Sequence, residues 1–434
     1  MIENTRRLTT GTSPFRSATQ TRPTGRSRAK RYIIYSAIFL SPFLNLKAEF
    51  VYFTASDGLY ILALMLIVLQ GDLRKFPLGQ VGPFWITAFV LVSSGIYLSS
   101  LFVGDAWRGV ALCLQYFFCF ILLPQILIQD DEDEAYRLII AFILGILALD
   151  IHGIITFYTV GYTPDSRVVT GGMRLATLNG TANGAARLNA MAIVITLWLF
   201  NIRRISILTF LCFITTMVVA LVLTSSNTGL IATVTGLTTY FALTFRPALI
   251  LRIIPAIAVI AAFFLLGGVE YLPATFQRRV LGAVLSGDIT EAGTFVDRTA
   301  LMLEALEMIA SRGFTLLGIG ADQFRLYSVQ QTPVHNTFLL LWIEGGVLSL
   351  AGWLLMSTMG VIVWLLAWRQ HVIPHGRAAV FVCFAVFVTL SSASAHIYAR
   401  YWYTALILVM QPTIIAMSQG NREKSVARML ARTR

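Results

Sequence analysis

The chain has 434 residues, of which 57% are hydrophobic and only 12% are charged, and its formal net charge at pH 7 is +12. Because a soluble globular protein carries about twice that charged fraction, the composition excludes an ordinary soluble enzyme. Apolar runs long enough to cross a bilayer, about 20 residues each, recur along the sequence. They predict an all-α, polytopic transmembrane helix bundle, since backbone that faces lipid must be helical.

Basic residues crowd both ends of the chain, in residues 1–31 and 419–434. Nucleic-acid binding is one interpretation of such tails, but no aromatic or folded context accompanies the arginines. We therefore expect no nucleic-acid partner and interpret both as cytoplasmic tails that contact membrane lipids. The first apolar run is followed by no clear signal-peptide cleavage site, so it is expected to remain as the first helix. The four cysteines lie within apolar runs without CxxC spacing, which predicts neither disulfides nor a zinc site.

Twelve membrane spans are predicted, at 32–46, 51–70, 83–103, 107–129, 138–160, 185–201, 204–223, 228–245, 249–267, 336–367, 378–396 and 401–418. Pro42 interrupts the first span, and the tenth is long enough to be tilted or to project beyond the bilayer. An even number of spans places both basic tails on one side. With that side in the cytoplasm, each inner loop among these spans carries arginine or lysine, whereas the short outer turns carry one basic residue, Lys47. The bundle is thus expected to occupy residues 32–418.

Ionisable groups inside the spans have two interpretations. Asp150 and His152 lie two residues apart in the fifth span and therefore face different sides of the helix. They could belong to a proton path, but hydrogen bonds to neighbouring helices are the simpler interpretation. The same interpretation applies to Asp57 in the second span.

Two outer segments are longer than simple turns, 161–186 and 268–335. Within the second, residues 295–311 (FVDRTALMLEALEMIAS) have a helical pattern with the apolar residues mostly on one side. This pattern predicts an amphipathic helix that lies flat on the outer leaflet or caps the bundle. The two segments and the start of the sixth span together hold eight arginines: Arg167, Arg174, Arg187, Arg278, Arg279, Arg298, Arg312 and Arg325.

Any one of these arginines can be a solvated loop charge that pairs with a nearby carboxylate. As a set they have a second interpretation, because the planar guanidinium group matches phosphate oxygens and stabilises charge on a phosphate leaving group. In "GMRLATLNGTANGAARLNA", 172–190, the Asn-Gly pairs at 179–180 and 183–184 suit a tight turn before a helix. That turn would place Arg187 in the first helical turn, at the membrane surface.

The stretch "TPVHNTFLLLWIEGGVLSL", 332–350, places polar groups at the start of the tenth span. His335 lies just outside the span, on the same side as the arginines. It is either a surface histidine at a helix start or a general base that orients or deprotonates an acceptor hydroxyl. Asn336 could hold the imidazole ring or contact a sugar. Glu344 lies about 13 Å farther along the helix and is expected to be a structural group bonded to another helix.

These stretches, together with "GIGADQF" at 318–324, resemble the O-antigen ligase and bacterial polysaccharide polymerase family over about residues 170 to 370. The resemblance implies a metal- and cofactor-independent glycosyltransferase of the bacterial inner membrane. Its donor is expected to be a polyprenyl-diphosphate-linked glycan, used at the periplasmic face. Ligases transfer the glycan to the lipid A core, and polymerases transfer it to another lipid-linked repeat unit.

By position, Arg174, Arg298 and His335 match the motif of that family. The chain departs from it between the seventh and eighth spans, where Ser226-Asn227 stands in place of the common Ser-Arg. Arg187 or Arg325 are the candidates for replacing the missing cation.

The sequence thus predicts an inverting glycosyltransferase with the lipid A core as acceptor. His335 is its candidate catalytic residue. The predicted diphosphate-binding residues are Arg174, Arg187, Arg298 and Arg325, with Asn183, Asn336 and Glu344 in support. A polymerase of the same family is the alternative. A transporter or flippase for lipid-linked sugars is the alternative from another class, to which the buried ionisable groups of the spans give some support.

Overall fold

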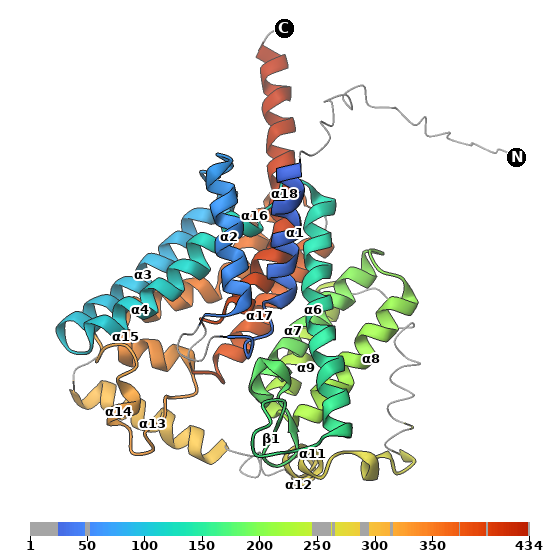
Figure 1. The fold of residues 1–434 in the computed structure, drawn as a ribbon. Coiled ribbons are helices and arrows are strands. Elements are labelled where there is room, and N and C mark those ends of the chain that lie inside the picture. Colours follow the sequence, from blue (N-terminus) through green and yellow to red (C-terminus); the bar gives the residue numbers. More distant parts are fainter. Residues whose placement is uncertain are drawn as a thin grey trace, which may run out of the picture.

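Helices form nearly all of the regular structure that the computed structural model describes (Figure 1). The described residues are 25–47, 53–244, 262, 265–286, 295–312, 316–372, 374–395 and 398–432. Within them, a two-residue strand, β1 (Val169–Thr170), pairs antiparallel with β2 (Arg174–Leu175). This small hairpin lies in the first outer segment, where no strand was predicted.

The helices of the first half are α1 (Gly25–Leu40), α2 (Ala55–Leu69), α3 (Gly82–Phe102), α4 (Ala106–Phe117), α5 (Leu123–Leu127), α6 (Glu132–Thr159), α7 (Ala182–Asn201), α8 (Ile207–Thr224) and α9 (Asn227–Thr244). Those of the second half are α11 (Ala274–Phe276), α12 (Gly282–Ser286), α13 (Phe295–Arg312), α14 (Phe324–Tyr327), α15 (Thr337–Ser357), α16 (Met359–Arg369), α17 (Pro374–Ser391) and α18 (Arg400–Arg432). Shorter turns are η1 (Gly79–Val81), η2 (Phe118–Leu122), η3 (Thr177–Asn179), η4 (Gly268–Tyr271) and η5 (Gln277–Leu281).

Seven of the described helices are long and apolar enough to cross a membrane, and three more apolar helices are shorter. The predicted all-α, multi-pass membrane protein is thereby confirmed. The number of twelve spans stays a prediction, because the ninth, 249–267, falls almost wholly outside the described residues. The amphipathic helix predicted at 295–311 is present as α13.

Helix ends follow from local sequence. The helix α1 ends at Leu40, two residues before Pro42, whose ring is incompatible with helical backbone just before it. The helix α2 begins with a capping box, in which the Thr54 hydroxyl accepts from the Asp57 amide and the Asp57 carboxylate accepts from the Thr54 amide. At the other extreme, α18 continues beyond the predicted span and through most of the basic C-terminal tail, to Arg432.

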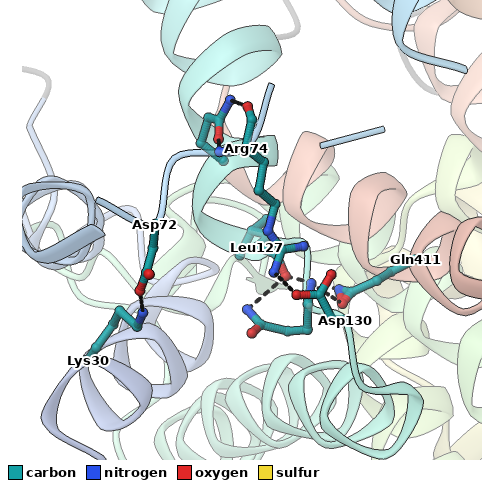
Figure 2. Close-up of polar contacts among 8 residues, drawn as sticks. Lys30, Asp72, Arg74, Leu127, Asp130 and Gln411 are labelled. Carbon is teal, nitrogen blue, oxygen red and sulfur yellow. Dashed lines mark hydrogen bonds and ion pairs between the residues drawn. The ribbon is translucent and has the colours of Figure 1, made fainter. Parts of the chain in front are cut away.

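The bundle has two distinct ends (Figure 1). The start of α1 and the end of α18 lie at one end, and β1 and α11 to α14 gather at the opposite end. Polar contacts close the first end, as Figure 2 shows: Lys30 pairs with Asp72, and Arg74 pairs with Asp130 at 3.0 Å. Nearby, Gln411 of α18 donates to the last carbonyl of α5 at 3.0 Å. The described parts of the two predicted outer segments therefore share the end opposite to the start of α1.

The predicted tenth span is not one helix, which corrects the expectation of a single long element at 336–367. It is divided into α15 and α16, and α15 is itself broken at Gly346, whose φ of 69° and ψ of −168° are non-helical. Residues 316–320 dock against this break. The Leu316 carbonyl accepts from Val347 at 3.2 Å, and the Gly320 amide donates to the Glu344 carbonyl at 2.9 Å. Backbone groups freed by the break are thus satisfied by another segment of the protein, as a non-polar environment requires.

Gly346→Ala is expected to destabilise the fold. A β-carbon at this position would collide with the Leu316 carbonyl, and the backbone conformation is one that only glycine adopts easily. We expect a loss of about 3 kcal/mol, seen as a lower Tm of the purified protein in detergent. The matched variant is Gly420→Ala, where a β-carbon meets nothing within 4 Å. Equal Tm values for the two variants would contradict the role of the break.

Candidate active site

Arg174 is held at the edge of the β1–β2 hairpin. Its Nε donates to the Thr224 carbonyl at the end of α8, at 2.9 Å, and a terminal nitrogen donates to Asn183 Oδ1 at 3.0 Å. The same Asn183 oxygen accepts from the Ser226 hydroxyl at 3.0 Å. Asn183, in the first turn of α7, therefore fixes Arg174 relative to both α7 and the turn between α8 and α9.

Several positive charges surround Arg174. Burial, together with the charges of Arg279 and Arg298, lowers the pKa of Arg174 to about 10. The pKa of Arg298, on α13, is also lowered, first by burial and then by the charge of Arg279. The charge of Arg279 thus acts on both Arg174 and Arg298, which brings together guanidinium groups from three separate segments. An anionic ligand among them would relieve that repulsion.

Arg187 projects from α7. The helix begins at Ala182, with Thr181 as its cap. Arg187 therefore lies in the second turn, and the predicted position in the first turn is wrong. A terminal nitrogen donates to the Ala393 carbonyl at 3.0 Å, while the buried Nε has no hydrogen-bond partner among the described residues. Within the described part of the chain, Arg187 forms no ion pair, so its charge is available to a ligand.

His335 lies in the loop just before α15 and is half-buried. Burial lowers its pKa from the ordinary value, and the charges of Arg298 and Arg187 lower it further, while the Pro333 carbonyl acts in the opposite direction. The imidazole is therefore neutral at pH 7 and able to accept a proton. Its position near two of the arginines places a base beside a cationic region.

Asn336 caps α15. Its Oδ1 accepts from the Phe338 amide at 3.0 Å and from the Leu339 amide at 3.2 Å. The adjacent Thr337 hydroxyl donates to the Ala395 carbonyl at 2.6 Å. These bonds fix the start of α15 and, through the chain, the position of His335. His335 thus lies at the start of the helix, as predicted, and the residue that caps the helix is the next one, Asn336.

Glu344 and Arg325 belong to a different polar group. Glu344 is 1% exposed, and its Oε1 accepts from the amide of Phe324, the first residue of α14, at 3.3 Å. Nearby, Asp322 pairs with Arg108 at 2.7 Å and with Arg325 at 3.1 Å. Arg325 is therefore engaged by a carboxylate, and the structure does not bring it to Arg174 and Arg187.

Asn227 has a structural role at the corner where this chain departs from the family pattern. Its Nδ2 donates to the carbonyl of Arg279, in η5, at 3.0 Å. The same outer segment is tied to the hairpin, because the Thr275 hydroxyl donates to the Gly172 carbonyl. These contacts bring Arg279 to the corner. The sequence showed Arg279 as one of eight outer arginines, but no local pattern distinguishes it from the others.

Two of the ionisable groups inside the spans, Asp150 and Asp57, have partners on other helices. Asp150 is fully buried, and its Oδ1 accepts from Asn189 of α7 at 3.1 Å. Asp57 pairs with Arg400 of α18 at 3.0 Å. His152 is exposed on the outside of α6, so it does not face Asp150. The contacts of Asp150 and Asp57 agree with the simpler interpretation of these residues as buried structural groups. For His152 the predicted buried position is wrong, because its side chain is exposed.

The comparison with known families concerns the middle of the chain. Residues 210–354 match a family model described as O-antigen ligase. The matched part includes Arg279, Arg298, His335 and Glu344, whereas Arg174 precedes it. No curated protein matches the chain. The resemblance to the O-antigen ligase family that the sequence indicates is thus confirmed.

Proposed function

We propose that the protein is a glycosyltransferase of the bacterial inner membrane that moves a glycan from a polyprenyl diphosphate to the lipid A core. The observation that carries this proposal is the position of Arg298, whose charge acts on Arg174 and also, together with Arg187, on the neutral imidazole of His335. Both basic tails would lie in the cytoplasm, so this region would face the periplasm. The family match supports an enzyme that acts on lipid-linked glycans.

In the proposed reaction, His335 accepts the proton of an acceptor hydroxyl while that oxygen attacks the anomeric carbon of the donor glycan. The bond between this carbon and the diphosphate oxygen breaks, and the electron pair leaves with the diphosphate. The guanidinium groups stabilise the negative charge that develops on the leaving group. A single displacement of this kind inverts the anomeric configuration. Asn183 and Asn336 would support it by holding Arg174 and the histidine loop in place.

The test is a transfer assay with the purified protein in detergent, without a membrane gradient. The protein receives its native polyprenyl-diphosphate glycan together with either lipid A core or a second lipid-linked repeat unit. We expect glycan on the lipid A core. Product with the second repeat unit alone would identify a polymerase. Movement of the lipid-linked glycan across vesicles, without product in either reaction, would favour a flippase and contradict the proposed enzyme.

A further inference from the structure

A cavity of about 380 Å³ is lined by Arg187 but not by Arg174, Arg298 or His335. Its walls come from the turn after α1, the start of α2, the last turn of α4, the loop before α7 and the start of α18. All but the α4 wall are ends of helices that face the outer segments (Figure 1). Arg187 lines this cavity and also influences the pKa of His335, so one side chain connects the cavity to the proposed catalytic region.

The walls combine side-chain amides with aromatic rings. Asn45, Gln115 and Asn179 supply the amides, and Tyr401 and Trp402 supply rings. An amide offers both a donor and an acceptor, which suits a ligand that carries many hydroxyl groups. An aromatic ring offers an apolar face with a polar edge, which suits the C–H face of a sugar ring. A cavity for an acyl chain would instead have a predominantly apolar wall.

The charges of the cavity also favour a hydroxyl-rich ligand over a second diphosphate. The carboxylate of Asp57 forms a 3.0 Å ion pair with Arg400 in the wall, and the two side chains are only 3% and 16% exposed. This pair is neutral as a whole, and its carboxylate would repel a phosphate. Gln115 lies next to it, because its Oε1 accepts from Arg400 at 3.5 Å. Arg187, on the side of the proposed diphosphate site, lines the cavity and forms no ion pair within the described part of the chain.

We propose that this cavity binds a sugar residue of a substrate, with the amide-lined wall facing its hydroxyl groups and Arg187 marking the side nearer the diphosphate. The proposal rests on the proposed glycosyltransferase function and adds the place where the carbohydrate is recognised. The sugar belongs either to the lipid-linked donor or to the acceptor, because both present the same chemistry. The volume of the cavity, about 380 Å³, lies within the range of small-ligand pockets.

The experiment measures binding to the full-length protein in lipid nanodiscs. Three probes are compared: bare undecaprenyl diphosphate, the native polyprenyl-diphosphate glycan, and the delipidated core oligosaccharide. Gln115→Leu keeps the approximate size of the side chain and removes its amide. We expect this variant to weaken one of the two carbohydrate probes by roughly tenfold and to leave bare undecaprenyl diphosphate unaffected. The probe that loses affinity identifies the sugar as that of the donor or of the acceptor.

A second variant and a control keep the result decisive. Asn45→Leu alters another wall and is expected to affect the same probe, so the test survives if one variant fails to fold. Gln323→Leu makes the same chemical change outside the cavity and should bind all probes like the wild type. Wild-type affinity of both cavity variants for both carbohydrate probes would overturn the sugar site. Failure of the wild type to bind either lipid diphosphate would instead count against the proposed function.

Discussion

His335→Ala is expected to lower the rate of glycan transfer by about 10³-fold, because a positioned general base contributes about 10²- to 10⁴-fold to such reactions. The side chain lies outside the core of the bundle, so the variant should fold with an unchanged Tm. Affinity for the lipid-linked donor should also change little, because the arginines remain. The measurement is kcat in the detergent assay, with donor binding determined separately. Unchanged kcat would remove His335 from the mechanism.

The pH dependence offers a second readout of the same residue. Burial and the charges of Arg298 and Arg187 lower the pKa of His335 below 6.5. The imidazole accepts a proton only when it is neutral, so kcat/KM should be constant near pH 7 and should fall as the pH drops below that lowered pKa. The matched control is His152→Ala, which removes an exposed histidine of α6. Strong loss in this control would point to a proton path through the spans and favour the transporter.

Arg298→Ala is expected to lower transfer by about 10²- to 10³-fold, the usual cost of removing one group that stabilises charge in a transition state. The charge of Arg298 lowers the pKa of both Arg174 and His335, so this residue acts on the arginines and on the candidate base. Arg298→Lys should recover only part of the rate, because lysine keeps the charge but not the planar pair of donors. Both kcat and the affinity for bare undecaprenyl diphosphate should fall.

Arg325→Ala is the matched control for this prediction. Arg325 is exposed and pairs with Asp322, away from Arg174 and Arg187. Its loss should leave transfer within about twofold of the wild type, because an exposed ion pair contributes little. Equal loss in Arg298→Ala and Arg325→Ala would show that the outer arginines act only through net charge. The proposed diphosphate site would then lack a defined geometry.

Features set by local sequence could be predicted, and those set by docking could not. The amphipathic helix α13 was predictable because its apolar period lies within residues 295–311. The break of α15 at Gly346 was not, because the segment that satisfies the freed backbone groups is distant in sequence from the helix interior. The glycines at 345–346 permit such a break, but they do not show which segment completes it.

The residues of the candidate site also fall into two groups, those that the sequence distinguishes and those that only packing distinguishes. His335 and Arg298 were recognisable because each occupies a marked position, at the start of a span and at the start of an amphipathic helix. Arg279 and Arg325 look alike in the sequence. Only the bond from Asn227 to the Arg279 carbonyl, and the ion pair of Arg325 with Asp322, separate them. Those contacts depend on how α9, η5 and α14 pack, which no single stretch of sequence specifies.

The docking of residues 316–320 onto the break of α15 has a consequence for the loop that carries His335. Both ends of this loop are fastened to the same helix, one at the break and one at the cap beside Thr337. The entropy of ordering the loop is therefore lost once, during folding, and not again at each encounter with an acceptor. A base carried in this way is preorganised, so the rate of turnover should not depend on a slow rearrangement of its own loop.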